Sequence, residues 1–203
     1  MLTSTPKRLP QVLTRDEVRA LFGALPRRGR VAARNRAILA LMYKAGLRVS
    51  EVCRLRLSDL DAPSLSIQVR RGKGGRDRIV YPDLEAWKVL GDWLAAHPGG
   101  EWLFPLLRAT PWRPDLDGGR HVTPRYVEAL VRNLARRAGI AKRVTPHTLR
   151  HTYATEAVRE GVPLHQVQRD LGHAHLATTA VYLHVADTER EARARARPPA
   201  GIA

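Results

Sequence analysis

The chain has 203 residues, 44% of them hydrophobic, which is enough to bury the core of one domain. Its longest apolar run, near residues 37–43, is far shorter than the roughly 20 residues that cross a bilayer, so we expect a cytoplasmic protein with no membrane partner. With 35 Lys and Arg against 19 Asp and Glu, the formal net charge is +16, which makes nucleic acid the first partner to consider.

The first part of the chain predicts three helices and a β-hairpin. Residues 14–17 form a capping-box pattern, so a helix begins there. A second helical pattern runs over residues 31–46 and a third over residues 50–57. Two stretches of alternating hydrophobicity then flank the glycine-rich, basic segment 70–75, which predicts a hairpin over residues 65–81.

The rest of the chain is mainly helical. Helical patterns cover residues 84–96, 123–138, 145–160, 164–171 and 176–185. Gly139 and Gly161 stand where helices should stop, and the Pro- and Gly-rich segment 105–121 is typical of a loop. We therefore expect a mainly α fold with a small antiparallel β-sheet, in the α+β class.

An enzyme that cleaves DNA without a metal needs a nucleophile, several fixed positive donors for the phosphate oxygens, and an acid for the leaving 5′ oxygen. Uncatalysed cleavage of phosphate esters is so slow that the barrier must fall by something approaching 20 kcal/mol. One pre-aimed donor supplies only about 3 to 4 kcal/mol. A cluster of donors is therefore required.

The chain contains a matching set, scattered in sequence: Arg48, Glu51, Lys73, His147, Arg150, His173 and Tyr182. Arg48 lies at a predicted helix start, where backbone N–H groups also favour an anion. His147 and Arg150 are three residues apart, on one face of a helix. Alone, each residue has an ordinary explanation, such as a solvated arginine or a half-buried core tyrosine. The ordered set is what favours chemistry.

In order and spacing, these segments resemble the catalytic domain of the tyrosine recombinase and phage-type integrase family, which includes the Xer-like recombinases. The likeness runs from about residue 9 to residue 187. It rests on five motifs, which are G-L-R-x-S-E from Gly46, the K-G hairpin at Lys73, T-P-H-x-L-R-H-T-x-A-T from Thr145, L-G-H ending at His173 and T-T-x-x-Y ending at Tyr182.

The resemblance implies site-specific cleavage and rejoining of DNA through a 3′-phosphotyrosyl intermediate, without metal, ATP or other cofactor. Tyr182 would be the nucleophile, and Arg48 and Arg150 would bind the non-bridging phosphate oxygens. Lys73 would be the general acid for the leaving 5′ hydroxyl.

Three further roles follow from the same resemblance. His147 and His173 would donate hydrogen bonds to the phosphorane, and Glu51 would orient Arg48. We interpret His151 as a supporting residue, packed beside the site, with direct involvement as the less favoured alternative. Although His147 and His151 have the i, i+4 spacing of a metalloprotease pair, the glutamate of that motif is missing and Arg150 lies between them, so no metal is expected.

The resemblance also divides the chain. Residues 1–10 would be a tail or linker, residues 11–187 the catalytic domain, and residues 188–203 a C-terminal tail that could exchange between protomers. The helical core-binding domain that usually precedes the catalytic domain in this family is expected to be absent, so a partner protein could be needed. The expected partner is double-stranded DNA, bound by a monomer that assembles into a tetramer on DNA, in the nucleoid.

Two other hypotheses about the function remain open. A type IB topoisomerase shares the nucleophile and the basic cluster but relaxes supercoils instead of exchanging strands. The histidine of L-G-H and the close H-x-L-R spacing favour a recombinase. A DNA-binding protein of the same fold without activity is the other alternative, and the full set of expected catalytic residues argues against it.

Overall fold

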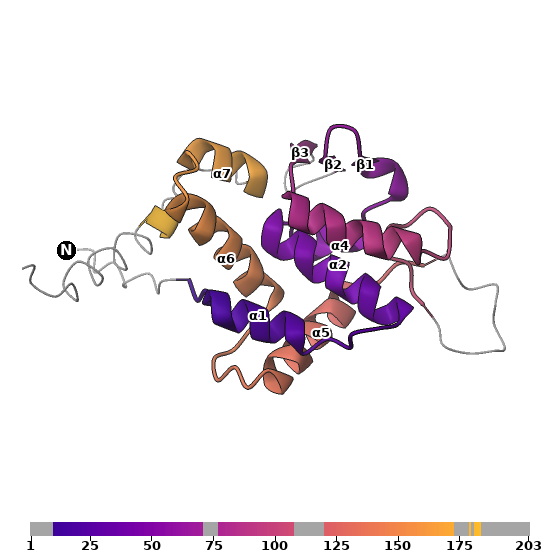
Figure 1. Ribbon diagram of the computed structural model, residues 1–203. Helices are drawn as coiled ribbons and strands as arrows, with labels where there is room; N and C mark the ends of the chain where they lie inside the picture. The colour runs from indigo at the N-terminus through magenta and orange to yellow at the C-terminus, as the bar shows by residue number, and fades with distance from the viewer. Residues whose placement is uncertain (1–9, 71–76, 108–119, 173–178, 180, 184–203) are drawn as a thin grey trace, which may run out of the picture.

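The computed structural model describes residues 10–70, 77–107, 120–172, 179 and 181–183. Within them, helices pack around a core with a small sheet at one side (Figure 1), which confirms the predicted fold class. The elements are α1 (Arg15–Gly23), α2 (Arg30–Lys44), α3 (Val49–Cys53), the 3-10 helix η1 (Leu57–Asp59), β1 (Leu60–Asp61), β2 (Ser66–Val69), β3 (Arg78–Val80), α4 (Leu84–Ala95), α5 (Pro124–Arg137), α6 (Pro146–Arg159) and α7 (Leu164–Leu171).

Local capping explains where most helices begin. The Thr14 side chain accepts a hydrogen bond from the Glu17 backbone N–H, and the Glu17 side chain accepts one from the Thr14 backbone, so the predicted capping box is confirmed. Thr123 and Thr145 cap α5 and α6 in a similar way, each followed by a proline at the first helical position.

Helix α3 is shorter than the prediction over residues 50–57. It ends at Cys53 because the following backbone pairs with a distant segment. The Leu103 N–H donates to the Leu55 carbonyl at 2.8 Å, and the Leu57 N–H donates to the Glu101 carbonyl at 3.0 Å. These groups therefore have partners outside a helix, which a local pattern could not reveal.

The three strands form an antiparallel sheet in the order β1-β2-β3. Ile67 of β2 lies opposite Leu60 of β1 and Val80 of β3. The predicted hairpin is thus confirmed at β2 and β3, and its tip, residues 71–76, lies outside the described residues. Strand β1 was not predicted, since two residues are too few to show an alternating pattern.

Helix α2 forms the centre of the core. Ile38, Leu39, Leu41 and Met42 are fully buried on it, and it packs chiefly against α4 and α6, which lie beside it in Figure 1. A second, smaller apolar cluster joins α6 to α7 and consists of Ala154, Ala157, Val167, Leu171 and Tyr182. This second cluster carries the predicted nucleophile.

Glycines fix two kinds of turn. Gly139 and Gly161 follow helices with φ of +69° and +85°, as predicted for helix stops. Gly46, with φ of +61°, joins α2 to α3 where a Cβ would lie only 2.4 Å from Cδ1 of Tyr153. Close packing of α6 against this turn therefore requires glycine. Among the described helices, none has the length and apolar character needed to span a membrane.

Candidate active site

A buried carboxylate, Glu51, organises the candidate site. Its Oε2 accepts the Arg48 backbone N–H at 2.7 Å, and its Oε1 accepts Nη1 of the Arg48 side chain at 2.8 Å. Arg78, on β3, donates to both oxygens at 2.9 and 2.8 Å. One carboxylate thus holds two guanidinium groups from two segments. The pair with Arg78 is bidentate, which is the stronger arrangement of an arginine and a carboxylate.

The charge of Glu51 is maintained by these arginines. Burial alone would raise its pKa, but the hydrogen bonds and positive charge of Arg78 and Arg48 outweigh burial and hold the pKa at about 2. Glu51 is therefore ionised across the physiological range. Its role as the predicted orienting group for Arg48 has a direct geometric counterpart in the ion pair.

Arg150, on α6, belongs to the same cluster. Its side chain is 4% exposed, and it donates from Nη1 to the Gly46 carbonyl at 2.6 Å and from Nη2 to the Leu171 carbonyl at 2.5 Å. Nη1 also lies 3.9 Å from Oε2 of Glu51. Burial and then the charge of Arg48 lower the pKa of Arg150 to about 9, which still leaves it protonated at neutral pH.

The end of α7 is held by the same arginines. Arg48 donates from Nη2 to the Gly172 carbonyl at 3.1 Å, and Arg78 donates from Nε to the Asp170 carbonyl at 2.7 Å. The carbonyl end of a helix favours cations, because the backbone dipoles give it partial negative charge. The arginines therefore fix the position of the turn that precedes His173, which itself lies outside the described residues.

Arg78 was missed by the sequence analysis, although its side chain donates three hydrogen bonds, two to Glu51 and one to the Asp170 carbonyl. Its side chain is only 8% exposed. One signal could have identified it: in β3 it shares a strand face with the buried Val80, while Ile79 between them is exposed. An arginine on the inward face of a strand normally has a buried acidic partner.

Tyr182 lies beside this cluster, buried at 1% exposure. Nδ1 of His151 and the hydroxyl oxygen of Tyr182 are 2.8 Å apart, and the two ring centroids are 5.7 Å apart. Burial raises the pKa of Tyr182, while the charges of Arg150 and Arg48 act in the opposite direction. The predicted nucleophile is thus close enough to the arginines for their charge to stabilise its phenolate form.

His151 makes closer contact with Tyr182 than its expected supporting role required. Burial, and after it the charges of His147 and Arg150, lower the pKa of His151 to about 4. Its imidazole is therefore neutral at pH 7 and can accept the tyrosine proton in a hydrogen bond.

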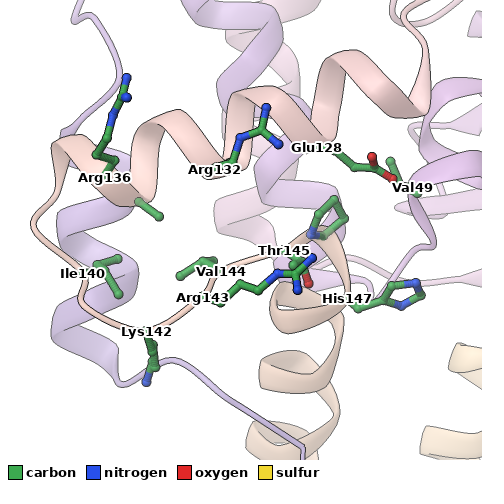
Figure 2. Close-up of a pocket in the computed structure, with 12 residues that line it drawn as sticks. Val49, Glu128, Arg132, Arg136, Ile140, Lys142, Arg143, Val144, Thr145 and His147 are labelled. Carbon is green, nitrogen blue, oxygen red and sulfur yellow. The ribbon is translucent and has the colours of Figure 1, made fainter.

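His147 is exposed on the first turn of α6, with its ring centroid 6.3 Å from that of His151. It borders a basic pocket of about 500 Å³ between α5 and the segment that leads into α6. Figure 2 shows Arg132 and Arg136 on α5 and Arg143 on that segment, with His147 at the edge. Positive charge therefore continues outward from the candidate site.

The structure thus brings together Arg48, Glu51, Arg150, His151 and Tyr182, with His147 at the surface nearby. Lys73 and His173 lie outside the described residues. A cluster of fixed cations beside a buried tyrosine is suited to binding an anion and stabilising the charge that develops on it.

The comparisons with known proteins agree with this geometry. The chain matches the phage integrase family over residues 11–189 and belongs to that family. Among the curated proteins, it is 37% identical over 184 residues to a tyrosine recombinase of Thermosipho africanus, covering 91% of this chain and 60% of that protein. It is 38% identical over 199 residues to the tyrosine recombinase XerA of Thermococcus onnurineus, covering 97% of this chain and 66% of that protein.

Solved structures lead to the same family. A crystal structure of XerA recombinase is 35% identical with a TM-score of 0.77, covering 98% of this chain and 68% of that one. XerH site-specific recombinase, bound to its palindromic difH substrate after cleavage, is 25% identical with a TM-score of 0.73, covering 95% of this chain and 54% of that one. The chain spans less than two thirds of the two curated relatives.

Proposed function

We propose that this chain cleaves and rejoins double-stranded DNA at specific sites through a covalent link between Tyr182 and a backbone phosphate. The observation that carries the proposal is the convergence of Arg48, Arg78 and Arg150 on Glu51, next to the buried Tyr182. Residues 11–187 form the catalytic domain in this proposal, and DNA is the partner. The names of the relatives, which are tyrosine recombinases, support it.

The chemistry has a defined course. The Tyr182 hydroxyl oxygen attacks phosphorus, a bond forms between them, and the bond from phosphorus to the 5′ oxygen breaks. Arg48 and Arg150 bind the non-bridging oxygens, where negative charge grows in the transition state. His147 and His173 add hydrogen bonds, and Lys73 protonates the leaving 5′ oxygen. Attack by a 5′ hydroxyl on the phosphotyrosine reverses the step, so the bond energy is conserved and no ATP is needed.

A topoisomerase-like relaxation would use the same covalent step with one duplex. Recombination is favoured because relatives solved with DNA include XerH with its difH substrate. Strand exchange also requires more than one protomer, and we propose a monomer that assembles into a tetramer on DNA in the nucleoid. A DNA-binding protein without activity would leave the buried, hydrogen-bonded tyrosine without a chemical role.

Covalent trapping tests the proposal. The chain is incubated without magnesium with a pool of nicked duplexes from its genomic neighbourhood, and denaturing gels detect a protein–DNA adduct. We expect an adduct that Tyr182→Phe abolishes and that Arg150→Ala reduces about 10²-fold or more, as for loss of one pre-aimed donor.

The controls separate the three functions. An adduct that persists in Tyr182→Phe would refute the assigned nucleophile. DNA binding that weakens with salt but gives no adduct on any duplex would favour the binding protein. Products that join two different duplexes would establish recombination, whereas relaxation of a plasmid without such products would favour the topoisomerase.

A further inference from the structure

The His151–Tyr182 pair has a geometry that the proposed function leaves unused. We infer that His151 is the general base that accepts the proton of Tyr182 when the tyrosine attacks phosphorus. This inference rests on the proposed function and deepens it, because it gives His151, which we first interpreted as a supporting residue, a direct part in the reaction.

The distance supports direct proton transfer. Nδ1 of His151 lies 2.8 Å from the hydroxyl oxygen of Tyr182, within the 2.6 to 3.2 Å at which a general base acts. His151 is on α6, one residue after Arg150, so the same helix carries the base and one of the phosphate-binding arginines. Their relative positions are set by one rigid element.

The other groups near the tyrosine are less suited to this role. Arg48 and Arg150 have no lone pair that can take a proton. Both carboxylate oxygens of Glu51 already accept hydrogen bonds from Arg48 and Arg78. His147, the other histidine of α6, is exposed. His151 instead lies within hydrogen-bond distance of the Tyr182 hydroxyl, which favours it as the base.

The protonation state fits the role. A base must be unprotonated before the reaction, and burial, followed by the charges of His147 and Arg150, lowers the pKa of His151 to about 4. The ring is therefore neutral at pH 7, although the same shift makes it a weaker base. A bound phosphate brings negative charge next to Arg150, which opposes these effects and stabilises the imidazolium as it forms. Among the described residues, the rings of Tyr182 and His147 lie beside this imidazole, and the charges of His147 and Arg150 act on it.

The proton balance is complete. The proton of the Tyr182 hydroxyl passes to Nδ1 of His151 as the bond from oxygen to phosphorus forms. The leaving 5′ oxygen takes a proton from a separate acid, which in our proposal is Lys73. During rejoining, the imidazolium of His151 returns its proton to the departing phenolate of Tyr182.

A leaving-group substitution tests this division of labour. Single-turnover cleavage is measured on a normal nicked duplex and on one whose 5′ bridging oxygen is replaced by sulfur, which leaves without protonation. Loss of the acid should be rescued by sulfur, so Lys73→Ala should recover most of its rate. Loss of the base should not be rescued, so His151→Ala should remain about 10²- to 10⁴-fold slow on both duplexes.

Two further variants distinguish proton transfer from positioning. In His151→Asn the amide oxygen can accept the tyrosine hydrogen bond but cannot take the proton, so it should be nearly as slow as His151→Ala. Imidazole in the buffer should partly restore His151→Ala and should not change Tyr182→Phe. His165→Ala, which removes an exposed histidine on α7, should cleave at the unaltered rate and serves as the matched control.

The outcomes are distinct. Cleavage by His151→Asn within about threefold of the unaltered chain would overturn the inference, since a general base contributes at least about 10²-fold. Rescue of His151→Ala by the sulfur duplex would assign His151 to the acid step and would also overturn it. In both cases, an adduct that depends on Tyr182 would still support the proposed function. The absence of any adduct with the unaltered chain would overturn the proposed function and the inference on His151 together.

Discussion

The ion pair between Glu51 and Arg78 should be the main polar contribution to the stability of the site. Arg78→Met removes the guanidinium group but keeps an unbranched side chain of similar length. Both partners are almost fully buried, with exposures of 5% for Glu51 and 8% for Arg78. The variant therefore leaves a buried carboxylate with Arg48 as its remaining side-chain donor within hydrogen-bond distance.

Two figures give the stability that Arg78→Met should lose. Removing one partner of a buried ion pair costs about 3 to 5 kcal/mol, because the other charge loses its compensation. The pKa of Glu51, lowered from 4.5 to about 2, corresponds to about 3 kcal/mol of net stabilisation of its ionised form after the cost of burial. Arg48 supplies part of this, so we expect Arg78→Met to lose about 2 to 3 kcal/mol at pH 7.

The stability that Glu51 contributes depends on pH. Because the pKa of Glu51 is lower in the folded state, its contribution is fully present above about pH 5 and is lost as the pH falls toward about 2. The difference in stability between the unaltered chain and Arg78→Met should therefore shrink over that window. Urea unfolding at pH 7, 5 and 3.5, followed by circular dichroism, measures it.

The reasoning would be refuted by a loss below about 1 kcal/mol at pH 7, since that is the range of exposed ion pairs. A difference that stays constant from pH 7 to 3.5 would also refute it. Arg19→Met is the matched control, because the partner of Arg19 is Asp16 in an exposed pair at 76% and 89% exposure. It should change stability by less than about 1 kcal/mol.

Two further predictions concern packing and DNA binding. Gly46→Ala should lower the melting temperature, because its Cβ would meet Tyr153 at 2.4 Å and its φ is +61°. Gly91→Ala, inside α4 with no atom near the new Cβ, should be neutral or stabilising by up to about 1 kcal/mol. Equal effects of the two variants in thermal unfolding would contradict this prediction. Replacing Arg132 and Arg136, which line the basic pocket, with alanine should reduce the salt dependence of binding to duplex DNA. The slope of log binding constant against log salt concentration should become less steep by about 2, as expected for two lost phosphate contacts. An unchanged slope would mean that DNA binds elsewhere on the protein.

Much of the fold could be predicted because its signals are local. The threonine caps at Thr14, Thr123 and Thr145 lie within three residues of the groups that they bind, and the glycine stops act on the helix that they end. The features that were predicted wrongly or not at all depend on contacts between distant residues. The end of α3 depends on backbone pairing with residues 101–103, and the two residues of β1 belong to the sheet only because β2 lies beside them.

The candidate site shows the same division. Arg48 and Glu51 are one helical turn apart within one motif, and the family resemblance implied that Glu51 orients Arg48. Arg78 is 27 residues from Glu51, and no motif in the sequence joined the two. His151 was identified by sequence, but its contact with a hydroxyl 31 residues away was not. The missed features are thus contacts between elements, whereas the predicted ones are contacts within an element or motif.

The contacts that hold the arginines still leave donors for an anion. Nη1 and Nη2 of Arg150 each donate to one backbone carbonyl, and each terminal nitrogen of a guanidinium has two N–H groups. By this count of donors, the bonds to Gly46 and Leu171 can be kept when a phosphate binds. Because donors that are fixed before the reaction stabilise the transition state most, the buried carbonyls and Glu51 contribute to catalysis in our proposal by keeping the arginines in place.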